Sequence, residues 1–177
     1  LVSIFLNANP FLDQPKSKLD GIPIAIKDNI LVEGMQCSAA STILRGFISP
    51  CDSTAVSKLR DSGAIIVGTT NMDEMCMGSF GLYGYDGKMV RNPIDPEYFC
   101  GGSSAGSASA VKSYKLWPPW VPTRVDQLII RPIAGAVFNE AVVWAYFALW
   151  IGLDSSSNET TGPMAHSMSD IHLMFDT

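Results

Sequence analysis

The sequence predicts an α/β fold, with strands and helices packed in layers. Three features indicate this fold: an alternating apolar run near the start, a helix that leads almost directly into a buried strand, and a composition suited to a packed core. Of the 177 residues, 47% are apolar and 16% are charged, which favours a folded domain over disorder. The chain starts at leucine and stops inside SDIHLMFDT, an amphipathic stretch typical of a helix. We therefore expect residues 1–177 to be a single, partial domain.

The first predicted element is a strand within GIPIAIKDNILVEG, residues 21–34. Ile22, Ile24 and Ile26 alternate with other residues, so their side chains fall on one side of an extended chain. An Asp-Asn pair, which favours a turn, follows Lys27 and ends the strand there.

Lys27 is the first candidate for chemistry. Because it follows apolar residues, its amine could be partly desolvated, which would lower its pKa and let the lysine act as a base. The alternative is a lysine on the surface, paired with Asp28 or another carboxylate. Position in the sequence alone favours this alternative.

The clearest predicted unit is CDSTAVSKLRDSGAIIVGTTN, residues 51–71. Asp52 or Ser53 can cap the start of a helix, and Gly63 can end it. Between these ends, three apolar residues recur at helical spacing: Ala55, Val56 and Leu59. The strand AIIVG follows directly, so helix and strand belong to one layered unit.

A long loop and a run of small residues come next. Residues 78–100 are rich in Gly, Met and Pro, which predicts an exposed loop of the kind that often carries function. Every side chain in residues 101–110 is a hydroxyl, a methyl or a hydrogen. Ser103, Ser104 and Ser107 lie here at the start of a predicted helix, where bare N–H groups can face an oxyanion. The alternative is a flexible Gly/Ser linker.

Several other classes of site are not expected. A net charge of −5 and scattered basic residues provide no face for direct RNA binding. The four cysteines and two histidines lack metal-binding spacing. Without a secretory leader, the cysteines predict buried, reduced thiols rather than a disulfide framework. The small-residue run also lacks the Gly-Lys-Ser/Thr ending of a phosphate loop.

Two stretches together carry a resemblance to a known family. GIPIAIKDNI at residues 21–30 and GGSSAGSASAV at residues 101–111 resemble the amidase signature family, whose mechanism uses a lysine, a bridging serine and a nucleophilic serine. The resemblance implies the amidase-signature fold, a mixed β-sheet layered with α-helices, with Lys27 as the catalytic lysine and Ser103 as the bridging serine after a cis peptide bond. It also implies contacts with the substrate from Met77, Ser79 and Ser104.

The stretches NMDEMCMGS and RNPIDP are similar, within this family, to the A subunits of glutamyl-tRNA(Gln) amidotransferases. GLYGYDGKMVRNPIDPEYF resembles their mitochondrial, fungal-type branch. The resemblance implies a glutaminase subunit in the mitochondrial matrix, without a cofactor of its own. Its partners would be the other subunits of the heteromeric enzyme, which hold Glu-tRNA(Gln) and amidate it using ATP and magnesium. The alternatives are a catalytically dead scaffold of this family and an amidase for a small free amide.

The resemblance breaks after Lys112. The family places its nucleophile downstream of the bridging serine, in a segment G-T-D-T-G-G-S-I whose amides also form the oxyanion hole. This chain has WVPTRVDQL there, and no serine occurs between Ser113 and Ser155. However, codons for residues 121–128, shifted to begin with the last base of the Trp120 codon, can encode Gly-Thr-Asp-Thr-Gly-Gly-Ser-Ile.

We therefore hypothesise that residues 112–153 are an aberrant, out-of-frame segment within the amidase domain. The same hypothesis accounts for the apolar run at residues 134–153, which is long enough to span a membrane. Asn139 and Glu140 would be costly inside a bilayer, so no membrane partner is expected.

Overall fold

The computed structural model describes residues 15–113, 121–124, 161–165 and 168–176. Most of the hypothesised out-of-frame segment, and the whole apolar run at residues 134–153, lie outside these residues. No helix in the described part of the chain has the length and apolar character needed to cross a membrane.

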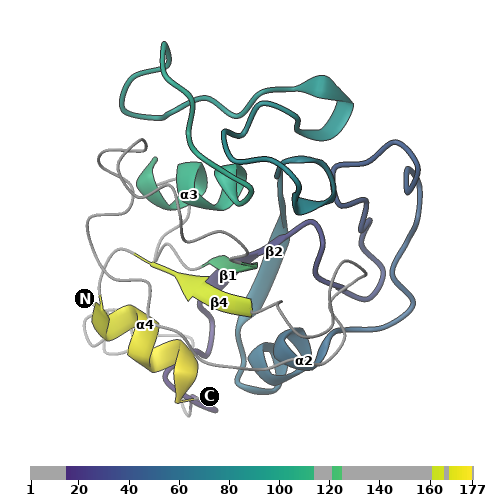
Figure 1. Cartoon of the computed structure of the whole chain (residues 1–177). Coiled ribbons are helices and arrows are strands. Elements are labelled where there is room, and N and C mark those ends of the chain that lie inside the picture. Colours follow the sequence, from purple (N-terminus) through teal and green to yellow (C-terminus); the bar gives the residue numbers. More distant parts are fainter. Residues whose placement is uncertain (1–14, 114–120, 125–160, 166–167, 177) are drawn as a thin grey trace.

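A parallel strand pair with a helical connection forms the centre of the fold (Figure 1). Strand β1 (Pro23–Lys27) pairs with strand β2 (Ile65–Thr70), and helix α2 (Thr54–Asp61) lies between them in the chain. The register places Lys27 opposite Thr70. The predicted strand, helix and strand, and with them the α/β fold class, are confirmed.

Helix α2 begins at the second of its two predicted caps. The Ser53 hydroxyl accepts a hydrogen bond from the Val56 N–H at 3.4 Å, as an N-cap side chain does. Asp52 instead forms an ion pair with Arg60 at 2.9 Å. At the other end, Gly63 has φ +89°, and a Cβ there would strike the Asp20 side chain, so the predicted glycine stop is confirmed.

Strand β1 is buried on both faces, which the alternating pattern does not indicate. Ile22, Ile24 and Ile26 have no exposed area and belong to the main core. On the opposite face, Ala25 packs against Val111. Helix α3 (Ala105–Lys112) covers that face, while α2 lies on the other side of the sheet (Figure 1). The main core consists of Leu19, Ile22, Ile24, Ile26, Ile30, Val32, Val56, Leu59 and Ala64. Each large side chain buried there stabilises the fold by about 1.5–3 kcal/mol.

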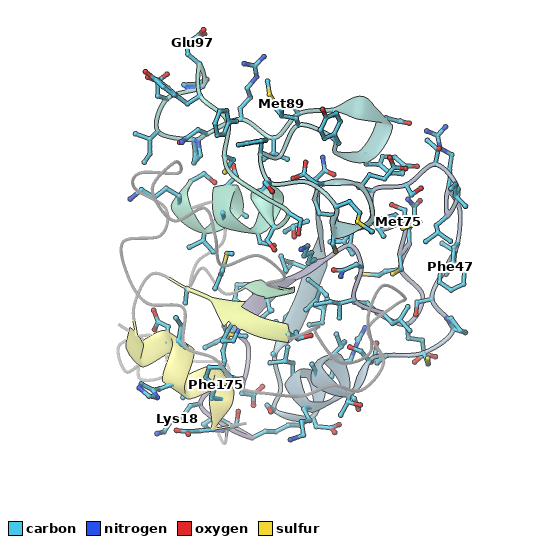
Figure 2. All side chains as sticks on the ribbon, viewed as in Figure 1. Lys18, Phe47, Met75, Met89, Glu97 and Phe175 are labelled. Carbon is cyan, nitrogen blue, oxygen red and sulfur yellow. The ribbon has the colours of Figure 1, made fainter. Side chains whose placement is uncertain are left out.

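The long connection from β2 to α3 contains two short 3-10 helices, η1 (Glu74–Cys76) and η2 (Tyr85–Gly87). Most of residues 78–100 form a loop above α3, which confirms that prediction. Figure 2 shows Glu97 at the outer tip of this loop and Met75 at its base, closer to the sheet.

The remaining elements follow α3. Strand β3 (Val121–Arg124) pairs antiparallel with β4 (Thr161–Met164). Helix α4 (Met168–Phe175) forms where the amphipathic stretch near the C-terminal end predicts it. Strand β3 lies within the span of the hypothesised out-of-frame segment.

All four cysteines are free thiols. Cys37, Cys76 and Cys100 are buried, as predicted, whereas Cys51 is exposed and is the exception. Burial raises the pKa of Cys37 and of Cys100 to about 11, with the charge of Asp28 adding to the effect at Cys37. Both thiols therefore remain protonated at neutral pH.

Candidate active site

Lys27 is the centre of the site. It is the last residue of β1 and has no exposed area. Its Nζ donates hydrogen bonds to Ser103 Oγ at 2.9 Å and to Ser104 Oγ at 2.8 Å. The alternative of a surface lysine is therefore wrong. Strand β1 is covered on both faces, so the whole Lys27 side chain is buried. It contacts two hydroxyls that are more than 70 residues away in the sequence.

The two serines lie in a tight turn at the start of α3. The peptide bond between Gly102 and Ser103 is cis, as the resemblance implies. Ser103 and Ser104 are both buried, and Ser104 is the residue that precedes the helix. The turn is ordered by its contacts, so the alternative of a flexible linker is wrong. Ser107 is not in this contact: its hydroxyl shares a 2.8 Å hydrogen bond with that of Thr70, which joins α3 to β2.

Close approach of other parts of the chain explains the glycines of this run. A Cβ at Gly102 would lie 2.0 Å from Asp73 Oδ2. A Cβ at Gly106 would lie 2.3 Å from the carbonyl oxygen of Asn71, which accepts the Gly106 N–H at 2.9 Å. Any larger side chain at either position would separate this run from Asn71 and Asp73, which follow the end of β2.

Asp28, the residue after Lys27, holds a turn at residues 38–40. Its Oδ2 accepts hydrogen bonds from the N–H groups of Ser38 and Ala40, both at 3.2 Å, and a short one from the Ser38 hydroxyl. Ala39 and Ala40 have positive φ values of 48° and 56°, an uncommon conformation for residues with a Cβ. The carboxylate therefore stabilises a turn that these two residues disfavour. Burial raises the pKa of Asp28, and the bonds from Ser38 and Ala40 oppose this rise.

The buried carboxyl gives the fold a pH dependence of defined sign. The pKa of Asp28 in the folded chain lies above its ordinary value of 3.8, so ionisation lowers the free energy of unfolding as the pH rises through the window between the two values. Asp28→Asn cannot ionise. We expect the free energy of unfolding of this variant, minus that of the wild type, to increase across the window and then level off.

Denaturant titrations of the Asp28→Asn variant and the wild type at a series of pH values measure this difference. A difference that stays constant, or that decreases as the pH rises, would show that the ionisation of Asp28 does not oppose folding.

The two other predicted substrate residues lie on the loop after η1. Met77, the first residue after η1, is 72% exposed, and Ser79 is half-buried two residues later. The role of Met77 and Ser79 as substrate contacts stays a prediction, whereas Ser104 lies directly on the lysine.

Sequence patterns do not indicate three polar side chains that support the site: Asp28, Asn71 and Asp73. The side chains of Asn71 and Asp73 accept hydrogen bonds from the N–H groups of Tyr85 and Tyr83, and so hold the long loop. One sequence feature could have indicated Asp73: it is an acidic residue inside the methionine-rich stretch NMDEMCMG. An acidic residue among apolar neighbours requires hydrogen bonds if it is buried.

Comparison with known proteins identifies the family. The sequence profile of the family described as Amidase matches residues 7–114, which is more than half of the chain. The chain belongs to the amidase family. It is 39% identical to the A subunit of the glutamyl-tRNA(Gln) amidotransferase of Symbiobacterium thermophilum over 166 residues, which make up 93% of this chain and 34% of that protein.

Two crystal structures of amidase-family proteins share the fold. The A subunit of the Thermotoga maritima glutamyl-tRNA(Gln) amidotransferase is 31% identical, with a TM-score of 0.72 over 92% of this chain and 36% of that one. The native peptide amidase of Stenotrophomonas maltophilia is 32% identical, with a TM-score of 0.76 over 90% of this chain and 34% of that one. The chain thus has the amidase-signature fold and spans about a third of the length of these relatives.

Proposed function

We propose that this amidase-family chain is part of the glutaminase subunit of a glutamyl-tRNA(Gln) amidotransferase. The observation that carries the proposal is the buried contact between Lys27 Nζ and Ser103 Oγ at 2.9 Å. Two lines of similarity support the substrate: the A subunits among the relatives, and the stretch NMDEMCMGS beside the site.

Lys27 and Ser103 supply the first two members of a proton relay. Burial disfavours an ammonium, so a neutral Lys27 amine accepts the proton of the Ser103 hydroxyl, and Ser103 accepts the proton of the nucleophilic serine. That serine adds to the carboxamide carbon of glutamine. The relay then returns the proton to the leaving nitrogen, ammonia departs, and an acyl-enzyme remains. Water, deprotonated by the same relay, releases glutamate and regenerates the serine.

We propose further that the nucleophilic serine is encoded in the shifted frame of residues 112–153. The absence of serine between Ser113 and Ser155 leaves the present chain without this group. The family match ends at residue 114, close to where the frame would change. The present chain is then inactive, although its lysine and bridging serine are in place.

The partners follow from the same proposal. Ammonia passes to a partner subunit, which amidates glutamate on tRNA(Gln) with ATP and magnesium. The glutaminase subunit needs no cofactor in the reaction. The loop sequence GLYGYDGKMVRNPIDPEYF supports a mitochondrial, fungal-type enzyme, and therefore a location in the mitochondrial matrix.

A peptide amidase among the similar structures supports a second candidate, an amidase acting on an amide without tRNA. Ammonia release by the full-length subunit, with the shifted frame of residues 112–153 restored, separates the two candidates. A glutaminase subunit should release ammonia from glutamine faster once partner subunits and Glu-tRNA(Gln) are added. A rate on glutamine that the partner and tRNA leave unchanged, or activity only on peptide or small amides, would support the second candidate and contradict the first.

A further inference from the structure

Asp73 forms hydrogen bonds with both the serine turn and the loop after η1, although it takes no part in the proposed relay. Its side chain has no exposed area. Oδ2 accepts a hydrogen bond from the Gly81 N–H at 2.9 Å, and Oδ1 accepts one from the Tyr83 N–H at 3.0 Å. The backbone N–H of Asp73 donates to the carbonyl oxygen of Ser103 at 3.0 Å. This residue therefore ties the loop after η1 to the serine turn.

Two glycines leave the space that this carboxylate fills. A Cβ at Gly102 would lie 2.0 Å from Asp73 Oδ2, and a Cβ at Gly78 would lie 2.3 Å from Asp73 Cγ. The carboxylate thus lies between the serine turn and the loop, with backbone close on both sides. Burying a carboxylate is costly unless hydrogen bonds compensate, so the two bonds from the loop N–H groups hold it there.

The segment that carries Met77 and Ser79 is attached to Asp73 at both ends. On one side, the Cys76 N–H donates to the Asp73 carbonyl oxygen at 3.0 Å. On the other side, the Gly81 N–H returns to the carboxylate of the same residue. Met77 is exposed between these attachments, so it is available to a ligand rather than to the core.

We propose that Asp73 is a positioning residue for substrate binding. It holds the segment of Met77 and Ser79 beside the serine turn, and so sets the affinity for the amide substrate while leaving the proton relay of Lys27 and Ser103 unchanged. The substrate class, a primary carboxamide, rests on the proposed function. The positioning of the loop by Asp73 rests on the hydrogen bonds alone.

Hydrogen exchange on the 177-residue chain tests the geometry. An asparagine has one acceptor oxygen and an NH2 group that cannot accept, so Asp73→Asn should speed exchange of the Gly81 or Tyr83 amide by about tenfold or more. Gly78→Ala displaces the same carboxylate from the loop side and should have the same effect. The matched control is Asp95→Asn, which changes an exposed carboxylate that accepts the Glu97 N–H at 3.1 Å. It should leave both amides unchanged.

Steady-state kinetics tests the effect on substrate, using the full-length subunit with the shifted frame of residues 112–153 restored and its partner subunits present. Asp73→Asn should raise KM for glutamine by about tenfold or more and keep kcat within about threefold, and Asp95→Asn should change neither. A loss of kcat with KM unchanged, or unchanged exchange in both the Asp73→Asn and Gly78→Ala chains, would overturn the proposal. If the enzyme with the restored frame releases no ammonia, the proposed function fails, and the exchange rates alone decide whether Asp73 positions the loop.

Discussion

Replacing Lys27 by methionine is expected to lower kcat for ammonia release from glutamine by about a thousandfold or more. The test protein is a graft in which residues 15–113 of this chain replace the matching segment of the Thermotoga maritima A subunit, which has the same fold. Methionine keeps an unbranched side chain in the buried space but cannot accept the proton of Ser103, and loss of a general base costs about 10²–10⁴ in rate. Because everything after residue 113 comes from the host, the result is independent of residues 114–153 of this chain.

Two further variants of the graft make this result specific. Lys27→Arg supplies hydrogen-bond donors and a permanent positive charge but does not lose a proton, so it should be as inactive as Lys27→Met. Lys58→Met changes an exposed lysine on α2 and should keep full activity. An active Lys27→Arg graft would show that the lysine acts by charge or position and not by accepting a proton.

Restoring the shifted frame across residues 112–153 is expected to turn an inactive subunit into an active one, once the rest of the subunit is present. The restored frame supplies the Gly-Gly-Ser segment, and with it the nucleophile and the oxyanion-hole amides. Loss of one oxyanion-hole donor alone costs about 10²–10³ in kcat, so losing the whole segment should reduce ammonia release to background. Assays of the full-length subunit with each version of the segment measure the change.

Genomic DNA across this window provides an independent measurement. The hypothesis predicts that the shifted frame encodes Gly-Thr-Asp-Thr-Gly-Gly-Ser-Ile at the position of residues 121–128. A shifted frame without Gly-Gly-Ser, or equal and non-zero ammonia release by the two versions of the subunit, would show that the segment WVPTRVDQL is the functional one.

Periodicity predicts the local elements of this fold well. The alternating isoleucines before Lys27 and the capped helix after Ser53 form the elements that their spacing indicates. Periodicity does not indicate that β1 is covered on its second face, because that cover comes from α3, which is distant in sequence. For the same reason, local sequence favours a surface position for Lys27: burial of a strand end depends on long-range packing that a local pattern does not contain.

The pairing of Lys27 with Ser103 is predicted by family resemblance and not by spacing. Neither resemblance nor spacing predicts the polar contacts that support this pair. Ala39 and Ala40 adopt positive φ without the glycine that marks such turns, and the buried bonds of Asp73 join backbone groups that carry no side-chain signal. The glycines at positions 102 and 106 are visible in the sequence, but what approaches them is a property of the folded chain.

The most direct test of the relay is a double-mutant cycle on Lys27 and Ser103 in the graft. Ammonia release is measured for Lys27→Met, for Ser103→Ala and for the double variant. Two members of one relay cannot act without each other, so the double variant should be about as slow as either single variant. Losses that multiply in the double variant would mean that the two side chains act independently, and would contradict the relay.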